Sequence, residues 1–189
     1  MKRSAPLLLL FLLAGCGTAT IAVDSWIVRR SSAATGTSDA DAVVVGLTGV
    51  EVASHLGGIV VQRLNGEIDT LVYHRWAAPV GEMVRAWIRS RLSESPRIRG
   101  IVGPGDSSRV RVRVEVRRFE FVETGAGTSD ATVELWGIVG DRPFGPILAT
   151  ESIVEATGEQ LPAAMAGALG RAVERLVPLV EAATPASAR

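Results

Sequence analysis

The side chains that most often carry chemistry in proteins are scarce in this chain. It has two histidines, His55 and His74, and a single cysteine, Cys16. The histidines are far apart and are not spaced as a metal-binding pair, and zinc sites are built from clusters of Cys and His. The chain has neither a Gly-x-Ser-x-Gly nucleophile motif nor a Gly-x-x-x-x-Gly-Lys-Ser/Thr phosphate loop. The sequence therefore predicts no catalytic residues, no metal ligands and no cofactor.

Cys16 follows a short segment that has the composition of an export signal. Lys2 and Arg3 precede an apolar run, Leu7–Leu13, and two small residues then lead to the cysteine. A basic start, an apolar middle and small residues before a cleavage point are the parts of a secretory signal peptide. The apolar run is far shorter than the roughly 20 residues that cross a bilayer. Residues 1–15 are therefore predicted to be a signal peptide and not a transmembrane helix.

The stretch Leu13-Ala14-Gly15-Cys16 resembles the lipobox of bacterial lipoproteins, in which the cysteine is lipidated and becomes the new N-terminus. The alternative is an ordinary signal peptide with an incidental cysteine. A single cysteine cannot form an internal disulfide, which favours lipidation in an exported chain. Several acyl chains on Cys16 give stable anchoring, because each buried CH₂ contributes about 0.8 kcal/mol. By resemblance to Gram-negative lipoprotein sorting, Gly17 in place of an aspartate favours the outer membrane.

Cleavage before Cys16 leaves a chain of the size of one domain. The whole sequence has 20 basic and 20 acidic residues, and the loss of Lys2 and Arg3 leaves a slight acidic excess. A nearly neutral protein lacks the basic surface that nucleic acids require, so no nucleic-acid partner is expected. No other stretch is long and apolar enough to cross a membrane. The sequence predicts a protein that is anchored to a membrane and does not span it.

The first half of the mature chain predicts strands and one helix. Residues 16–41 hold the anchor, a possible first strand and a polar linker. Strand-like runs follow at residues 42–47, 58–64 and 68–74, and Asn65-Gly66 predicts a hairpin between the last two. Apolar residues at helical spacing predict a helix opened by Pro79, because proline fits the first helical position. We expect Pro96 and the glycines of residues 100–105 to end it in a loop.

The clearest strand covers residues 109–122. Valines alternate there with charged residues such as Glu115, which is typical of a strand with one buried face and one solvated face. The alternation changes phase at Arg117-Arg118, and a β-bulge there would keep Phe119 and Phe121 on the buried face.

The second half of the chain predicts two more strands and a long helix. Residues 128–139 place Val133 and Leu135 on one face and Trp136 and Ile138 on the other, with Glu134 solvated. A turn at residues 141–143, a strand at 147–155 and a helix at 160–183 follow. The predicted fold class is α+β, a mostly antiparallel sheet with two amphipathic helices packed on one face. The domain is expected to occupy residues 42–183, with a frayed tail at 184–189.

The most distinctive cluster is Tyr73-His74-Arg75-Trp76-Ala77-Ala78-Pro79, between a strand and the first helix. One interpretation is structural: Trp76 fills the corner between strand and helix, and Arg75 covers it. The other is that His74, Arg75 and Trp76 contribute to a partner surface, because Arg and Trp are enriched in interface hot spots. The same alternatives apply to Arg118 and Phe119.

Four segments in this order resemble the ABC-type transport auxiliary lipoprotein family, the PqiC-like lipoproteins. They are Val45-Gly46, the cluster from Tyr73 to Pro79, Arg118-Phe119-Glu120 and Glu134-Leu135-Trp136. The resemblance runs from about residue 42 to the last helix, and His-Arg-Trp-Ala-x-Pro is its most specific part. Residues 49–59 lack the proline-rich segment that is common in the family.

The resemblance implies a non-catalytic periplasmic subunit that assists MCE-domain proteins and ABC transporter subunits in moving lipids or other hydrophobic molecules. His74, Arg75, Trp76, Pro79, Arg118, Phe119 and Trp136 are then the candidate partner-binding or structural residues. The alternative function is an outer-membrane assembly or envelope-integrity lipoprotein that binds another envelope protein; an anchored hydrolase is disfavoured by the missing nucleophile. An exposed sheet edge or the face of Trp136 and Ile138 could support a homo-oligomer.

Overall fold

The computed structural model describes residues 24–26, 42–125, 128–153 and 159–184. The predicted signal peptide, the predicted lipidation site Cys16 and residues 185–189 of the predicted tail lie outside these ranges. The first residue of that tail, Thr184, is buried and caps the last helix through its backbone N–H, which donates to the Glu181 carbonyl at 3.2 Å.

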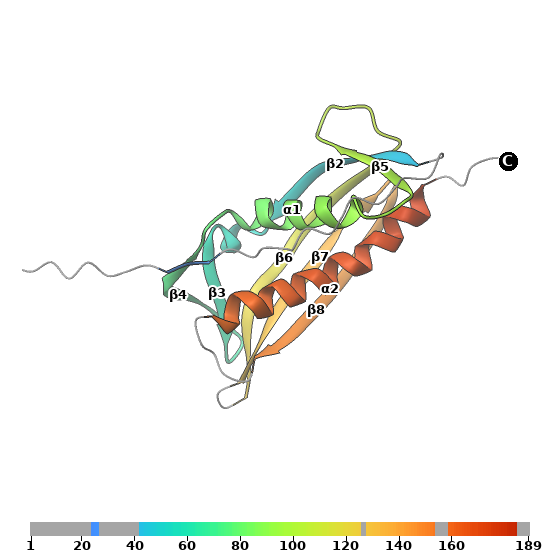
Figure 1. Cartoon of the computed structure of the whole chain (residues 1–189). Coiled ribbons are helices and arrows are strands. Elements are labelled where there is room, and N and C mark those ends of the chain that lie inside the picture. The colour runs from blue at the N-terminus through green and yellow to red at the C-terminus, as the bar shows by residue number, and fades with distance from the viewer. Residues whose placement is uncertain (1–23, 27–41, 126–127, 154–158, 185–189) are drawn as a thin grey trace, which may run out of the picture.

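The described residues form an eight-stranded sheet and two α-helices (Figure 1). The strands are β1 (Asp24–Trp26), β2 (Val43–Val52), β3 (Ile59–Leu64), β4 (Glu67–Trp76), β5 (Ile98–Val102), β6 (Val110–Gly125), β7 (Thr128–Val139) and β8 (Arg142–Ile153). A short 3₁₀ turn, η1 (Ser54–Leu56), joins β2 to β3, and the helices are α1 (Val80–Leu92) and α2 (Gln160–Ala183). Both helices lie across the same face of the sheet, with α1 against β2 and α2 against β7 and β8. The α+β class is therefore confirmed.

The long strand β6 organises the sheet. Its first half pairs in parallel with β2 and its second half in parallel with β3, so these two strands follow one another along the same side of β6. The strands β7 and β8 continue the sheet on the other side in antiparallel order. Beyond β3 lies antiparallel β4, and the parallel strands β5 and β1 complete the two ends. The predicted antiparallel pairing thus holds for β6–β7–β8 and β3–β4 within a mixed sheet.

Several element boundaries agree with the sequence. The bounds of β7 and α2 are those predicted, and α2 continues through Pro178. Asn65 and Gly66 have φ angles of 51° and 86°, as a tight hairpin turn requires. The register between β6 and β7 shifts between Val116 and Arg118, so the predicted bulge is present and Phe119 is buried.

Other boundaries differ from the prediction. Residues 100–105 were expected to be loop, but β5 extends to Val102 and pairs with β2. This five-residue strand contains three β-branched residues, Ile98, Ile101 and Val102, around a central glycine, and it pairs in parallel with β2. Pro79 has an extended ψ of 138° and precedes the helix, which begins at Val80. The strand β8 begins at Arg142, inside the predicted turn.

The core lies between the sheet and the two helices. Val112, Val114 and Val116 of β6 are fully buried there, as are Leu169 and Leu176 of α2. Burying a Val or Leu side chain contributes roughly 1.5–3 kcal/mol, so this layer supplies much of the stability of the domain. Because side chains alternate along β6, burial of the valines on the helix side leaves the charged residues between them on the opposite, outer face.

Candidate functional site

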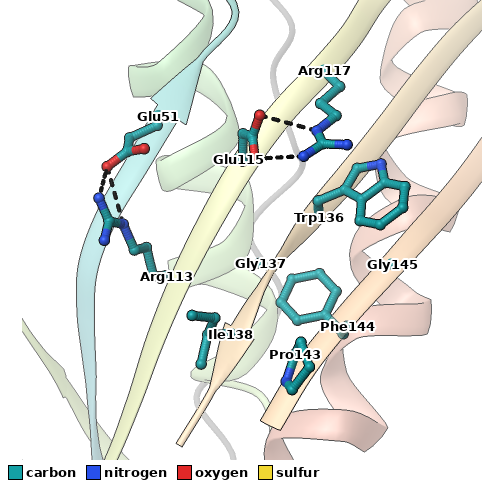
Figure 2. A pocket seen from close by; sticks show the side chains of 10 residues that line it. All are labelled: Glu51, Arg113, Glu115, Arg117, Trp136, Gly137, Ile138, Pro143, Phe144 and Gly145. Carbon is teal, nitrogen blue, oxygen red and sulfur yellow. Dashed lines mark hydrogen bonds and ion pairs between the residues drawn. The ribbon is translucent and has the colours of Figure 1, made fainter. Parts of the chain in front are cut away.

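A groove of about 650 Å³ lies on the outer face of the sheet, away from the helices (Figure 2). Strands β2, β6, β7 and β8 all contribute to it. Its lining residues are Glu51, Arg113, Glu115, Arg117, Trp136, Gly137, Ile138, Pro143, Phe144 and Gly145. The alternation along β6 that buries the valines is what places three charged residues in this groove.

The floor of the groove is apolar. Trp136 and Ile138 come from β7, and Pro143 and Phe144 come from the start of β8. Gly145 has a φ of 120°, and a Cβ at this position would come within 2.8 Å of the Trp136 ring. The glycine therefore leaves the space in which the indole lies flat against β8. Ile138 keeps 43% of its surface exposed and adds apolar area to the groove.

Ion pairs form one wall of the groove. Arg113 donates to Glu51, with 3.0 Å between Nε and Oε1. Arg117 donates to both carboxylate oxygens of Glu115, at 3.0 and 3.2 Å. The hydrogen bond from Arg117 lowers the pKa of Glu115, and the hydrogen bond to Glu51 raises the pKa of Arg113. The hydrogen bond to Glu115 likewise raises the pKa of Arg117.

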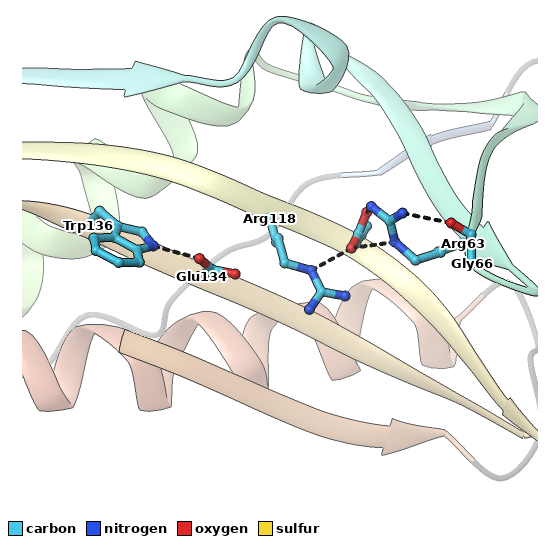
Figure 3. A network of polar contacts seen from close by, with 6 residues as sticks. Arg63, Gly66, Arg118, Glu134 and Trp136 are labelled. Atoms are coloured by element: carbon cyan, nitrogen blue, oxygen red, sulfur yellow. Dashed lines mark hydrogen bonds and ion pairs between the residues drawn. The ribbon is translucent and has the colours of Figure 1, made fainter. Parts of the chain in front are cut away.

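Arg117 also orders the aromatic floor. Its Cζ lies 4.3 Å from the centroid of the Trp136 ring, which is a cation–π contact. At the edge of the same ring, Nε1–H of Trp136 donates to Oε1 of Glu134 at 2.5 Å (Figure 3). A guanidinium on the ring face and a carboxylate on the ring nitrogen fix the position of Trp136. The groove is thus preorganised, which lowers the entropy cost of binding a partner.

A second polar network lies further along β6 (Figure 3). Glu120 is fully buried, and it accepts hydrogen bonds from Arg118 at 2.6 Å and from Arg63 at 3.2 and 3.1 Å. Arg63 continues to the carbonyl oxygen of Gly66 in the β3–β4 turn, at 3.0 Å. Burial by itself raises the pKa of Glu120, but the hydrogen bonds from Arg63 and Arg118 outweigh it and lower the pKa. This network ties the hairpin to the sheet.

The cluster from His74 to Pro79 is divided between core and surface. Trp76 is buried and meets Phe119 edge-on, with ring centroids 5.2 Å apart. Such an arrangement is favourable for aromatic rings and fills the corner between β4 and α1. Arg75 and Pro79 are exposed and His74 is half-buried. Trp76 and Phe119 thus lie where the structural interpretation placed them, and contact of this cluster with a partner stays a prediction.

The other candidate residues lie on the outer face. Trp136 belongs to the groove and Arg118 to the Glu120 network. Sequence reasoning did not single out Arg113, Pro143 or Phe144 as site residues. The alternation in β6 contained the signal for Arg113, but Pro143 and Phe144 were hidden because β8 was expected to begin later.

The described residues form neither a metal-binding cluster nor a membrane-spanning helix. No group of three or more His, Cys, Asp or Glu side chains there is placed to hold a metal ion. No helix within the same ranges is long and apolar enough to cross a bilayer. The arrangement that remains, an apolar floor beside paired charges, is of the kind found at protein interfaces.

Comparisons with solved structures support the fold. A crystal structure of a DUF330 protein from Xanthomonas campestris matches with a TM-score of 0.67 at 17% identity, over 85% of this chain and 96% of that one. A second solved structure, of an uncharacterized protein, matches with a TM-score of 0.59 at 13% identity, over 84% of this chain and 99% of that one. Among curated proteins there is no match.

The family comparison covers most of the chain. The model of the ABC-type transport auxiliary lipoprotein component matches residues 28–180, which include β2 to β8, α1 and nearly all of α2. The chain therefore belongs to the family of ABC-type transport auxiliary lipoprotein components.

Proposed function

We propose that this protein is a non-catalytic, lipid-anchored subunit that assists an MCE/ABC-type system in moving lipids or other hydrophobic molecules through the cell envelope. Membership of the transport auxiliary lipoprotein family is the observation that carries this proposal. In this proposal the lipid on Cys16 holds the domain at the outer membrane, facing the periplasm, because Gly17 follows the cysteine.

The outer-face groove is the surface that we assign to the MCE-domain partner. Trp136 and Phe144 offer rigid aromatic area, and Arg117 is already stacked on the indole. Trp, Tyr and Arg dominate interface hot spots, and side chains that are fixed before binding lose little entropy when the partner arrives. Ile138 adds an exposed apolar side chain that a partner would cover.

Co-purification from membranes tests this assignment. Tagged full-length protein should recover the MCE-domain protein and ABC transporter subunits when solubilised with its anchor intact. Ile138→Ser should weaken that recovery, because it removes apolar area from the groove. Leu179→Ser is the matched control, since Leu179 on α2 is similarly exposed, at 40% against 43%, and lies on the helix side of the sheet.

Two results would contradict the proposal. Equal recovery of the MCE protein by both serine variants would remove the groove from the docking surface. Recovery of another envelope protein, such as an outer-membrane β-barrel, with no MCE protein and no defect in lipid trafficking on deletion, would favour the envelope-integrity function instead.

A further inference from the structure

The corner of β4 formed by Val72 and Tyr73 is the most exposed apolar site in the described part of the chain. These side chains keep 74% and 54% of their surface exposed, more than any other large apolar residue described. The reason is local: Arg75 pairs with Ile59 and Thr70 pairs with Val61, so residues 71–74 stand opposite Val60 alone. The strand bulges there and turns its side chains outward.

Strand β1 begins beside this corner. Strand β1 pairs in parallel with β4, and Asp24 stands opposite His74. Because the two strands run in the same direction, the N-terminal end of β1 lies toward Tyr73 and Val72. From Cys16 to Asp24 there are eight residues, which span roughly 28 Å when fully extended and about 16 Å on average when flexible. A lipid on Cys16 would thus keep this corner close to its bilayer.

Arginines of the helices donate to backbone carbonyls of the outer strands β5 and β8. Arg89 of α1 donates to the Ile101 carbonyl of β5 at 3.3 Å, and Arg175 of α2 donates to the Leu148 carbonyl of β8 at 2.6 Å. Charged side chains at a strand edge oppose its pairing with another chain, so such an edge stays exposed to water. At the corner of β4 the outward side chains are apolar and aromatic instead, which is unfavourable in water and suits a membrane interface.

We propose that the Val72–Tyr73 corner rests on the phospholipid bilayer that holds the Cys16 lipid. Val72 enters the boundary of the acyl chains, the Tyr73 ring lies at headgroup level, and exposed Arg75 meets lipid phosphates. The contact is too small to hold a free domain, but the short tether gives the corner a high effective concentration at the surface. This inference rests on the proposed anchoring at Cys16, and it gives the domain a fixed orientation on its membrane.

Depth-dependent fluorescence quenching tests the contact in the lipidated, full-length mature protein. Lipidation occupies the chain's single cysteine, so an introduced cysteine is the only free thiol. Val72→Cys is labelled with an environment-sensitive fluorophore and reconstituted into phospholipid vesicles, with and without bromine on the acyl chains. Leu179→Cys is the matched control, because Leu179 is also exposed. Leu179 lies in the last turns of α2, at the opposite end of the domain from β4 (Figure 1).

The expected result is about a twofold loss of fluorescence with brominated lipid at position 72 and no loss at position 179. Flotation of the same vesicles separately measures whether the lipid anchor holds the protein on the membrane. A protein that floats with the vesicles but shows no quenching at position 72 overturns the corner contact and leaves the anchor standing. A protein that does not float overturns both. Disulfide cross-linking of two unlabelled Val72→Cys copies through position 72 would assign the corner to a second protomer and would also overturn the proposal.

Discussion

Glu120 provides a sharp test of the electrostatic argument, because it is fully buried and ionised between two arginines. Removing one partner of a buried ion pair typically costs 3–5 kcal/mol. The side chains of Arg63 and Arg118 keep 27% and 30% of their surface exposed, so water screens part of the pair. We therefore expect Glu120→Gln to lower the free energy of unfolding by roughly 2–3 kcal/mol at pH 7.

The pH dependence of this loss follows from the direction of the pKa shift. The pKa of Glu120 is lower in the folded state than in the unfolded state. The unfolded state therefore binds the proton more readily, and the stabilisation is complete above the unfolded pKa of about 4.3. It disappears as the pH falls through the folded pKa. The difference between wild type and Glu120→Gln should shrink steadily below about pH 4.

Urea unfolding of the folded domain at a series of pH values, followed by circular dichroism, measures this difference. Glu115→Gln is the control, because Glu115 makes the same kind of pair with Arg117 on the solvated outer face, where it should change stability much less. A Glu120→Gln variant as stable as wild type at pH 7 would refute the reasoning. So would a difference that is independent of pH.

Two further predictions concern the core and the anchor. Trp76→Ala should lower the free energy of unfolding by about 3–5 kcal/mol, because it opens a cavity against Phe119; thermal or urea unfolding measures this, and a loss below about 1 kcal/mol would argue against a core role. Cys16→Ser should leave the circular dichroism spectrum and the unfolding midpoint unchanged but release the protein from the outer-membrane fraction. If that variant still fractionated with the outer membrane and supported function, the lipid would be dispensable.

The local elements of the fold could be predicted from short-range pattern. The alternation of valine and charge in β6, the phase change at Arg117-Arg118 and the dipeptide Asn65-Gly66 each define backbone geometry within a few residues. The helical spacing of apolar residues likewise predicted α1 and α2. Strand β5 was missed because the glycines among residues 100–105 indicated a loop, although Ile98, Ile101 and Val102 favour a strand that pairs with β2.

The assembly of the outer-face groove could not be predicted in the same way. Glu51 and Arg113 are far apart in the chain. Trp136 of β7 lies against Gly145 of the neighbouring strand β8, and this contact can be predicted only when the bounds of both strands are known. A residue's partner across a sheet depends on strand order and register, and neither is written in the local sequence. The parallel pairing of both β2 and β3 with β6 is the decisive fact, because it brings Glu51 and Arg63 beside the long strand.

The sequence by itself predicted the export signal and the lipobox around Cys16, and it indicated the α+β class and the resemblance to the transport auxiliary lipoproteins. These depend on residues that are close together or in a recognisable order. Only the tertiary structure decided that Trp76 is turned into the core, that Glu120 is buried between two arginines, and that Trp136 forms the floor of a groove. The physical reason is that burial and charge pairing are made by contacts between distant segments, and those contacts exist only when the chain is folded.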